Sequence, residues 1–333
     1  MGTARVTPIA ATGEQFLGFD VFVPSINDDG VVAFTATLAG GRTGVFCGDG
    51  ASVGPVYLDG AAGPVVSHPD IDSAGNVCFY VEARVPVKSA VLHVDRATKR
   101  VRTLAEVGEV FQRIGPLGPT MIDGAVAFRA DTWAGDCGAF LARDDEVVRI
   151  ADTRGAFLEF DGLPVLDGAG RVVFRATLND EAEVIAASIG GPQVLLVATG
   201  NRFFSVGRFP AVNSAGTVVF AATLQGGGTG IFALEGGELR TVIDGTGAYE
   251  SFRGGLVWDD GAVVFYANPH GGPLGIFRGP DPVADCLLIK GQALFGTTVT
   301  DFALNPVSMN GPGQIAVRVK VATGDQLILR LEP

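Results

Sequence analysis

The sequence predicts an all-β protein, a seven-bladed β-propeller made of four-stranded antiparallel blades. Three observations predict it: a phrase that recurs seven times, a regular repeat period, and strand-and-turn chemistry in every repeat. The phrase is a polar turn, a glycine, a short apolar run and a phenylalanine. Its copies pair a signature glycine with a signature phenylalanine: Gly30 with Phe34, Gly75 with Phe79, Gly124 with Phe128, Gly170 with Phe174, Gly216 with Phe220, Gly261 with Phe265, and Gly313 with Val317 in the phenylalanine position.

The period separates the candidate repeat folds. Gly30 and Gly75 are 45 residues apart, and the longest interval, from Gly261 to Gly313, is 52. Such a period fits a propeller blade or a pair of helices. Each repeat is rich in Val, Ile, Phe and Thr and is interrupted by Gly, Pro, Asn or Asp, and the chain holds 48 glycines. This punctuation favours short strands and excludes long helices.

One repeat, residues 208–249, illustrates the expected blade. We expect an inner strand at Phe209–Val212, a turn at Asn213–Gly216 and a second strand at Thr217–Thr223. A glycine-rich loop then leads to a third strand at Gly230–Leu234, and a hairpin leads to a fourth at Leu239–Ile243. Asparagine and glycine suit the tight turn, because one supplies a side-chain acceptor and the other a permissive backbone.

The two ends of the chain complete each other. The last repeat stops after its third strand, residues 326–330, and its fourth strand is missing. Residues 4–16 resemble the fourth-strand segments at 147–157 and 239–249. We therefore expect the N-terminal strand to complete blade seven, which removes the open edge of the ring. Residues 1–333 then form one propeller domain.

The repeated phrase resembles the WD40-like propeller repeats of the TolB type. It is still more similar to bacterial tandem-repeat proteins built on Asn-x-x-Gly-x-Val-x-Phe-x-Ala, as in Asn213–Phe220. The resemblance covers nearly the whole chain. It implies the propeller fold and leaves the function open, because such propellers serve as binders, scaffolds and enzymes.

Composition limits the partners and the compartment. The net charge is −12 and the pI about 4.7, which disfavours nucleic acid and anionic membranes as partners. There is no apolar run of 18 residues and no visible signal peptide, so we expect no membrane span. We expect a cytoplasmic protein, or alternatively a secreted or periplasmic one whose signal has been removed. Few lysines beside abundant Ala, Gly and Val suggest a bacterial source.

Signatures of metal and cofactor chemistry are missing. The three histidines, His68, His93 and His270, lie in different repeats, which disfavours a multi-histidine metal site. A site that mixes histidine with carboxylates stays open. We expect no cofactor and no metal.

Positions where one repeat differs from the others indicate candidate functional residues. Positions that all the repeats share are explained by the fold alone. The variable positions follow the signature phenylalanine, near the loop that shares a face with the blade crossovers. Blades two to four gather one polar group there: His68, Tyr80, Glu82, Arg84, Arg113, Arg129, Asp131, Trp133, Glu159 and Arg175. Blade six supplies a second group: Arg253, Tyr266, Asn268 and His270.

These residues support two functional hypotheses. The first is a module that binds a small molecule or peptide on the axial loop face, with the arginines and aromatic residues as ligand contacts. The alternative is a cofactor-independent lyase, cyclase or isomerase, with Glu82, Asp131 or His68 as acid and base and arginines stabilising an anionic intermediate. A structural explanation also stays open, in which Arg129 and Arg175 form ion pairs with Glu82 and Asp131 between blades. The oligomeric state is undetermined.

Overall fold

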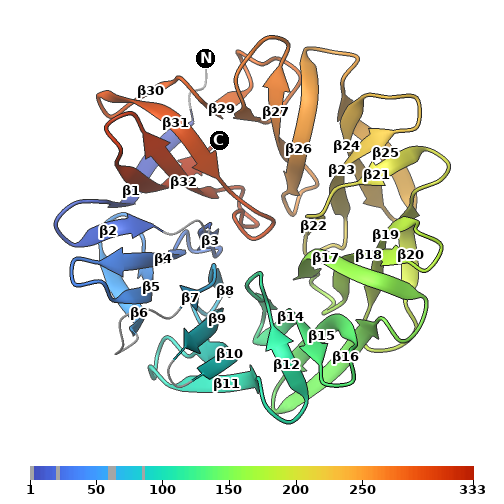
Figure 1. Cartoon of the computed structure of the whole chain (residues 1–333). Helices are drawn as coiled ribbons and strands as arrows, with labels where there is room; N and C mark the ends of the chain where they lie inside the picture. Colours follow the sequence, from blue (N-terminus) through green and yellow to red (C-terminus); the bar gives the residue numbers. More distant parts are fainter. Residues whose placement is uncertain (1–3, 20–22, 59–64, 85–86) are drawn as a thin grey trace.

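The computed structural model describes residues 4–19, 23–58, 65–84 and 87–333. Seven antiparallel sheets stand around a central axis and form a closed ring (Figure 1). The described residues contain strands and turns but no helix, so none could span a bilayer as a helix. The all-β, seven-bladed prediction is confirmed.

Each blade runs from an inner strand, usually broken in two, to an outer strand. Blade one contains β2 (Phe16–Phe19), β3 (Ser25–Ile26), β4 (Val32–Leu38), β5 (Thr43–Gly48) and β6 (Val53–Leu58). Blade two contains β7 (Val65–Val66), β8 (Asp70–Ile71), β9 (Val77–Arg84), β10 (Val87–Val94) and β11 (Val101–Glu106). Blade three contains β12 (Phe111–Ile114), β13 (Thr120–Ile122), β14 (Ala125–Thr132), β15 (Cys137–Arg143) and β16 (Glu146–Asp152).

The remaining blades repeat this plan. Blade four contains β17 (Phe157–Leu166), β18 (Val172–Leu178), β19 (Glu183–Ser188) and β20 (Val194–Ala198). Blade five contains β21 (Phe203–Val206), β22 (Ala211–Val212), β23 (Val218–Leu224), β24 (Thr229–Glu235) and β25 (Glu238–Asp244). Blade six contains β26 (Tyr249–Val257), β27 (Val263–Pro269), β28 (Gly275–Phe277) and β29 (Cys286–Ile289). Blade seven contains β30 (Ala293–Leu294), β31 (Thr297–Ala303), β32 (Ile315–Val321) and β33 (Gln326–Glu332).

The N-terminal strand closes the ring. Strand β1 (Arg5–Ala11) pairs antiparallel with β33, from Arg5 opposite Glu332 to Ala11 opposite Leu327. It is the outermost strand of blade seven, in the order β1-β33-β32-β31-β30. The prediction that the N-terminal strand completes the last blade is confirmed, and the pairing leaves no exposed edge on β33.

The signature glycine is required by the geometry of its turn. Gly30 has φ 75°, and its amide donates to the Asn27 carbonyl over 2.9 Å. Such a left-handed conformation costs a side-chain-bearing residue energy that glycine avoids. In blade three the turn is shortened to Asp123 (φ 46°) and Gly124 (φ 76°). Both residues have a positive φ, as the two central residues of a two-residue hairpin turn require.

The signature phenylalanine packs inside its own blade. In blade one, Phe34, Phe46 and Phe16 form a cluster in which the Phe16 and Phe46 ring centroids are 5.1 Å apart at 85°. Blade five repeats the cluster with Phe203, Phe220 and Phe232. Edge-to-face pairs of this kind add to the stabilisation that burial of the rings supplies.

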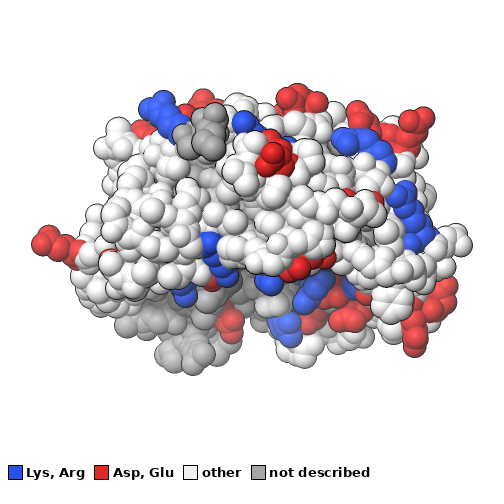
Figure 2. Space-filling model, turned by 90° about the horizontal axis from the view of Figure 1, so that it is seen from above, with Lys and Arg blue, Asp and Glu red and all other residues white. Residues whose placement is uncertain are grey.

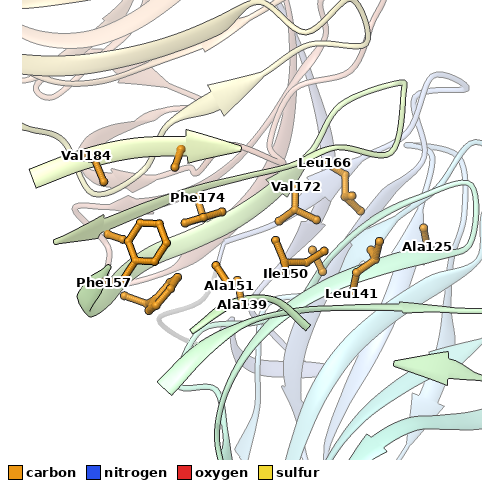
Figure 3. Packing of buried hydrophobic residues seen from close by; sticks show 14 residues of the cluster. Ala125, Ala139, Leu141, Ile150, Ala151, Phe157, Leu166, Val172, Phe174 and Val184 are labelled. Atoms are coloured by element: carbon orange, nitrogen blue, oxygen red, sulfur yellow. The ribbon is translucent and has the colours of Figure 1, made fainter. Parts of the chain in front are cut away.

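Adjacent blades share apolar cores. Between blades three and four, the small residues Ala139 and Ala151 lie beside Phe157, and Ile150 and Leu141 lie opposite Val172 (Figure 3). Alternating small and large side chains lets two twisted sheets pack without voids.

Turn asparagines also link neighbouring blades. The Asn27 Nδ2 donates to the carbonyl of Asp72 in blade two over 3.2 Å, and the Asn213 Nδ2 donates to Trp258 in blade six over 2.8 Å. Asn310 in blade seven donates to the carbonyl of Asn27 over 2.8 Å, across the closure of the ring. We call these three side chains the asparagine clamps. They satisfy polar groups that burial between blades would otherwise leave unpaired.

The second-to-third-strand loops share one face with the crossovers between blades. The Ala39 amide donates to the Gln15 carbonyl, and the Gln225 amide donates to the Arg202 carbonyl. We call this the crossover face and the opposite one the turn face. Seen edge-on, charged side chains of both signs gather mainly toward the two faces, and the belt between them is largely uncharged (Figure 2).

Candidate functional site

An axial cavity of about 430 Å³ receives side chains from every blade. Its apolar lining includes Val23, Leu117, Leu163, Phe209, Leu274 and Phe302, with Ala303 and Leu304 beside the last. Four polar residues complete the lining: His68, Arg253, Tyr266 and Asn305. A mostly apolar cavity with a few polar groups is the usual form of a small-molecule site.

The break in the inner strand positions these residues. A proline stands at or near the break in six blades: Pro24, Pro69, Pro119, Pro164, Pro210 and Pro306. Proline has no N–H group and therefore interrupts the strand ladder. The residue directly before it lines the cavity in five blades: Val23, His68, Leu163, Phe209 and Asn305. The cavity is therefore formed by the interrupted middle of the inner strands.

His68 is the most buried of the four polar residues. Its side chain is 3% exposed, and its Nδ1 accepts a hydrogen bond from the Gly118 amide over 3.3 Å. Gly118 leaves room for the imidazole, because a Cβ there would meet the ring at 2.8 Å. Burial lowers the pKa of His68 to about 4, so the ring is neutral at pH 7. Since Nδ1 accepts, the proton sits on Nε2, which is buried without a partner among the described residues.

Tyr266 presents a hydroxyl from blade six. It lies opposite Gly254 on β26, where any Cβ would overlap the hydroxyl, so glycine is required at this position. Burial raises the pKa of Tyr266 to about 12, so the hydroxyl keeps its proton. The phenol ring packs with the core shared by blades six and seven, and within the described chain its hydroxyl has no hydrogen-bond partner.

Arg253 and Asn305 complete the polar set. A register shift between Phe252 and Gly254 makes Arg253 the extra residue of a β-bulge, a device that redirects a side chain. Arg253 is exposed and forms no ion pair with the described residues. The Asn305 Oδ1 accepts from the Val307 amide (3.0 Å) and the Ser308 hydroxyl (3.2 Å), which leaves Nδ2 as its available group. Each of the four polar residues thus offers a hydrogen-bond donor, the Tyr266 oxygen can also accept, and no described carboxylate lines this cavity.

The predicted group in blades two to four is arranged differently. Tyr80 donates to Glu82 over 3.2 Å and accepts from Ser89 over 2.9 Å. Arg113 and Asp131 lie 3.7 Å apart as a half-exposed ion pair. Two of the three proposed catalytic residues, Glu82 and Asp131, therefore contact side chains of their own blades and do not line the axial cavity with His68.

The arginines of this sector also have partners. Arg175, 5% exposed, pairs with Asp161 and Glu183 of its own blade, and Arg208 of blade five reaches Asp161 at 2.9 Å. Arg129 donates to the carbonyl of Gly162 in blade four over 3.3 Å. These contacts link blades three, four and five. The partners of Arg129 and Arg175 are not the Glu82 and Asp131 that the sequence analysis considered.

The remaining predicted residues lie at the edge of the crossover face. The Trp133 indole, 61% exposed, donates to the Gly108 carbonyl, and Glu159 is exposed on β17. Asn268 donates to Gly272 over 3.2 Å, and a His270 ring nitrogen lies 3.2 Å from the Gly247 carbonyl. Arg84 ends β9, but its side chain lies outside the described residues.

The structure thus brings together His68, Arg253 and Tyr266 and adds residues that sequence reasoning missed. The missed ones are mainly apolar, and Asn305 is the polar one. The proline that recurs before the signature turn could have identified Val23, Leu163, Phe209 and Asn305. Leu274, from the loop before β28, carries no comparable sequence signal.

A second axial cavity, of about 450 Å³, lies at the turn face. Asp28, Asp72 and Asp259 border it, and each accepts hydrogen bonds from nearby turn residues. Across the described ranges, no group of three or more His, Cys, Asp or Glu side chains is placed to hold a metal ion.

Comparisons with known proteins agree on the fold. No protein-family model matches the chain, and no curated protein matches it significantly. Among solved structures, the propeller domain of the Trilobed protease from Pyrococcus furiosus has a TM-score of 0.64 at 10% identity, covering 93% of this chain and 95% of that one. That propeller has an open velcro topology, whereas β1 closes the ring here.

One further structure extends this likeness, and TolB resembles the chain less closely. Oligogalacturonate lyase from Vibrio parahaemolyticus has a TM-score of 0.59 at 11% identity, covering 99% of this chain and 98% of that one. TolB from Acinetobacter baumannii has a TM-score of 0.45 at 10% identity, covering 88% of this chain, which spans 59% of the TolB chain. At such identities the likeness shows the fold alone. The chain therefore has the β-propeller architecture, and its resemblance to the TolB-type repeats and to the bacterial tandem-repeat proteins stays a prediction.

Proposed function

We propose that the protein binds a small molecule in the axial cavity, between the crossover face and the middle of the inner strands. The observation that carries the proposal is the buried Nε2–H of His68, which has no acceptor among the described residues. An unpaired buried donor costs about 1–3 kcal/mol, and a ligand that supplies an acceptor removes that cost. The cavity volume also lies in the range of small-molecule sites.

Binding is favoured over catalysis by the chemistry of the lining. The alternative function, a cofactor-independent enzyme, needs an acid and a base at one site. In the described lining His68 is the only candidate base, and a pKa of about 4 makes it a weak one. A peptide is a second candidate ligand for the same cavity. It would lie on the crossover face and insert one of its side chains into the cavity.

Crystallographic soaking with a diverse fragment library tests the proposal. We expect fragments to accumulate in the axial cavity of the native protein. Leu163→Trp, which replaces a 1% exposed lining residue with a larger ring, should exclude them. Leu117→Phe is a second variant that fills the cavity with a smaller added volume. Leu158→Trp is the matched control, because Leu158 is 56% exposed on the same strand and does not line the cavity. Fragments that bind elsewhere and leave the native cavity empty would refute the proposal.

A further inference from the structure

We infer that the ligand is a monocarboxylate with an apolar body and a neutral hydrogen-bond acceptor at its far end. The inference rests on the proposed function and specifies the chemical class that the axial cavity selects. It follows from the charge, the position and the hydrogen-bonding state of the four polar residues in the lining.

The first step concerns the sign of the ligand's charge. Arg253, His68 and Asn305 each leave a donor available, and the Tyr266 hydroxyl can donate as well as accept. A cationic or donor-rich ligand would find the Tyr266 oxygen as its one free acceptor side chain in the described lining. An acceptor-rich, anionic ligand satisfies each group, and a guanidinium binds a carboxylate through two parallel hydrogen bonds.

The second step concerns the amount of charge. Arg253 is the one cation in the described lining, because His68 is held neutral by burial. A single guanidinium balances a single carboxylate. A phosphate dianion or a second carboxylate would leave one negative charge uncompensated in a largely apolar cavity, which is costly.

The third step concerns the ligand's two ends. Arg253 and Tyr266 belong to blade six and Asn305 to blade seven, so the carboxylate site lies on that side of the axis. His68 belongs to blade two, three blades away from blade six around the ring. The rest of the lining is apolar and includes Leu163 of blade four, Phe209 of blade five and Phe302 of blade seven. A ligand that spans the axis therefore places an apolar body in the middle and offers His68 an uncharged oxygen.

A matched set of probes built on an eight-carbon chain tests this class by titration calorimetry at pH 7.5. Monomethyl suberate has one carboxylate and one neutral ester, octanoate lacks the ester, suberate has two carboxylates, and octanamide has no charge. We expect monomethyl suberate to bind most tightly, octanoate next, and suberate and octanamide at least about tenfold more weakly than monomethyl suberate, the usual effect of a charge-assisted hydrogen bond.

Two variants test which residue binds each end of the ligand. Arg253→Met should reduce octanoate binding to the level of octanamide and leave octanamide unchanged. His68→Leu should reduce monomethyl suberate binding to the level of octanoate. Arg208→Met is the control for a lost surface arginine, because Arg208 is exposed, pairs with Asp161 and does not line the cavity. Melting temperatures of all variants confirm that each one folds.

The outcomes separate this inference from the proposed function. If octanamide binds as tightly as octanoate, or if Arg253→Met leaves octanoate binding unchanged, the carboxylate class is wrong even where fragments occupy the cavity. If suberate equals monomethyl suberate, the neutral far end is wrong. If soaked fragments never enter the native cavity, the proposed function itself fails.

Discussion

The asparagine clamp at the ring closure offers a sharp test of how the blades are held together. Asn310 is 6% exposed, and its Nδ2 donates to Asn27 (2.8 Å) and to the Gln314 Oε1 (2.9 Å). Its Oδ1 accepts from the Gln314 amide over 2.7 Å. Asn310→Asp keeps the shape and that acceptor, but it replaces the donor with an oxygen that faces the Asn27 carbonyl.

The expected cost follows from these contacts. The Asn27 carbonyl keeps its bond from the Gly30 amide, so the main penalty is a buried carboxylate oxygen placed against a carbonyl. We expect a loss of about 2 kcal/mol, in the range for an unpaired buried polar group. Unfolding entropy is about 2.1 cal/mol/K per residue, so across 333 residues this loss lowers the Tm by about 3 °C.

Scanning calorimetry at pH 7.5 and pH 4.5 measures the effect. The deficit should shrink at the lower pH, because a protonated carboxyl regains a donor. Asn179→Asp is the control: Asn179 is exposed and donates to the Gly155 carbonyl over 3.0 Å, where water can replace the lost bond. An Asn310→Asp protein that melts with the native one at both pH values would refute the clamp argument.

Three further perturbations test the fold. Phe34→Ala, at a 1% exposed position, should lower the free energy of unfolding, measured by urea denaturation, by about 3–5 kcal/mol. Leu17→Ala, at a 62% exposed position, should lower it by less than about 0.5 kcal/mol. Equal losses for the two variants would contradict the core assignment. Removing residues 1–12 uncovers the edge of β33, so we expect aggregation on size-exclusion chromatography, and a monomer of native Tm would contradict the closure. Burial raises the pKa of Asp70 from 3.8 to about 7, so stability should fall as pH rises through that window, and Asp70→Asn should remove this fall; parallel pH profiles of the two proteins would count against it. His68 acts in the opposite direction, since its pKa falls from 6.5 to about 4 and its contribution is lost as pH drops through that range.

The sequence by itself determined the architecture. Every blade repeats a turn and a signature glycine, and six of the seven follow them with a buried phenylalanine, which Val317 replaces in blade seven. Local chemistry therefore indicates the period and the strand order in each repeat. The second, third and fourth strands predicted for residues 208–249 match β23, β24 and β25 to within one residue at each end. The inner strand was the exception: it begins earlier, as β21, and is interrupted before β22, because Pro210 cannot continue the ladder.

Only the tertiary structure decided where the polar residues meet. Arg113 with Asp131, and Arg175 with Asp161 and Glu183, find partners within their own blades, and sequence spacing does not reveal which neighbour lies closer. His68, Arg253, Tyr266 and Asn305 come from three blades, and they share a cavity because the ring closes around its axis. Convergence of that kind depends on the curvature of the whole ring. The sequence of one repeat is therefore enough to determine the fold of its blade. The axial cavity forms only when all seven blades are in place.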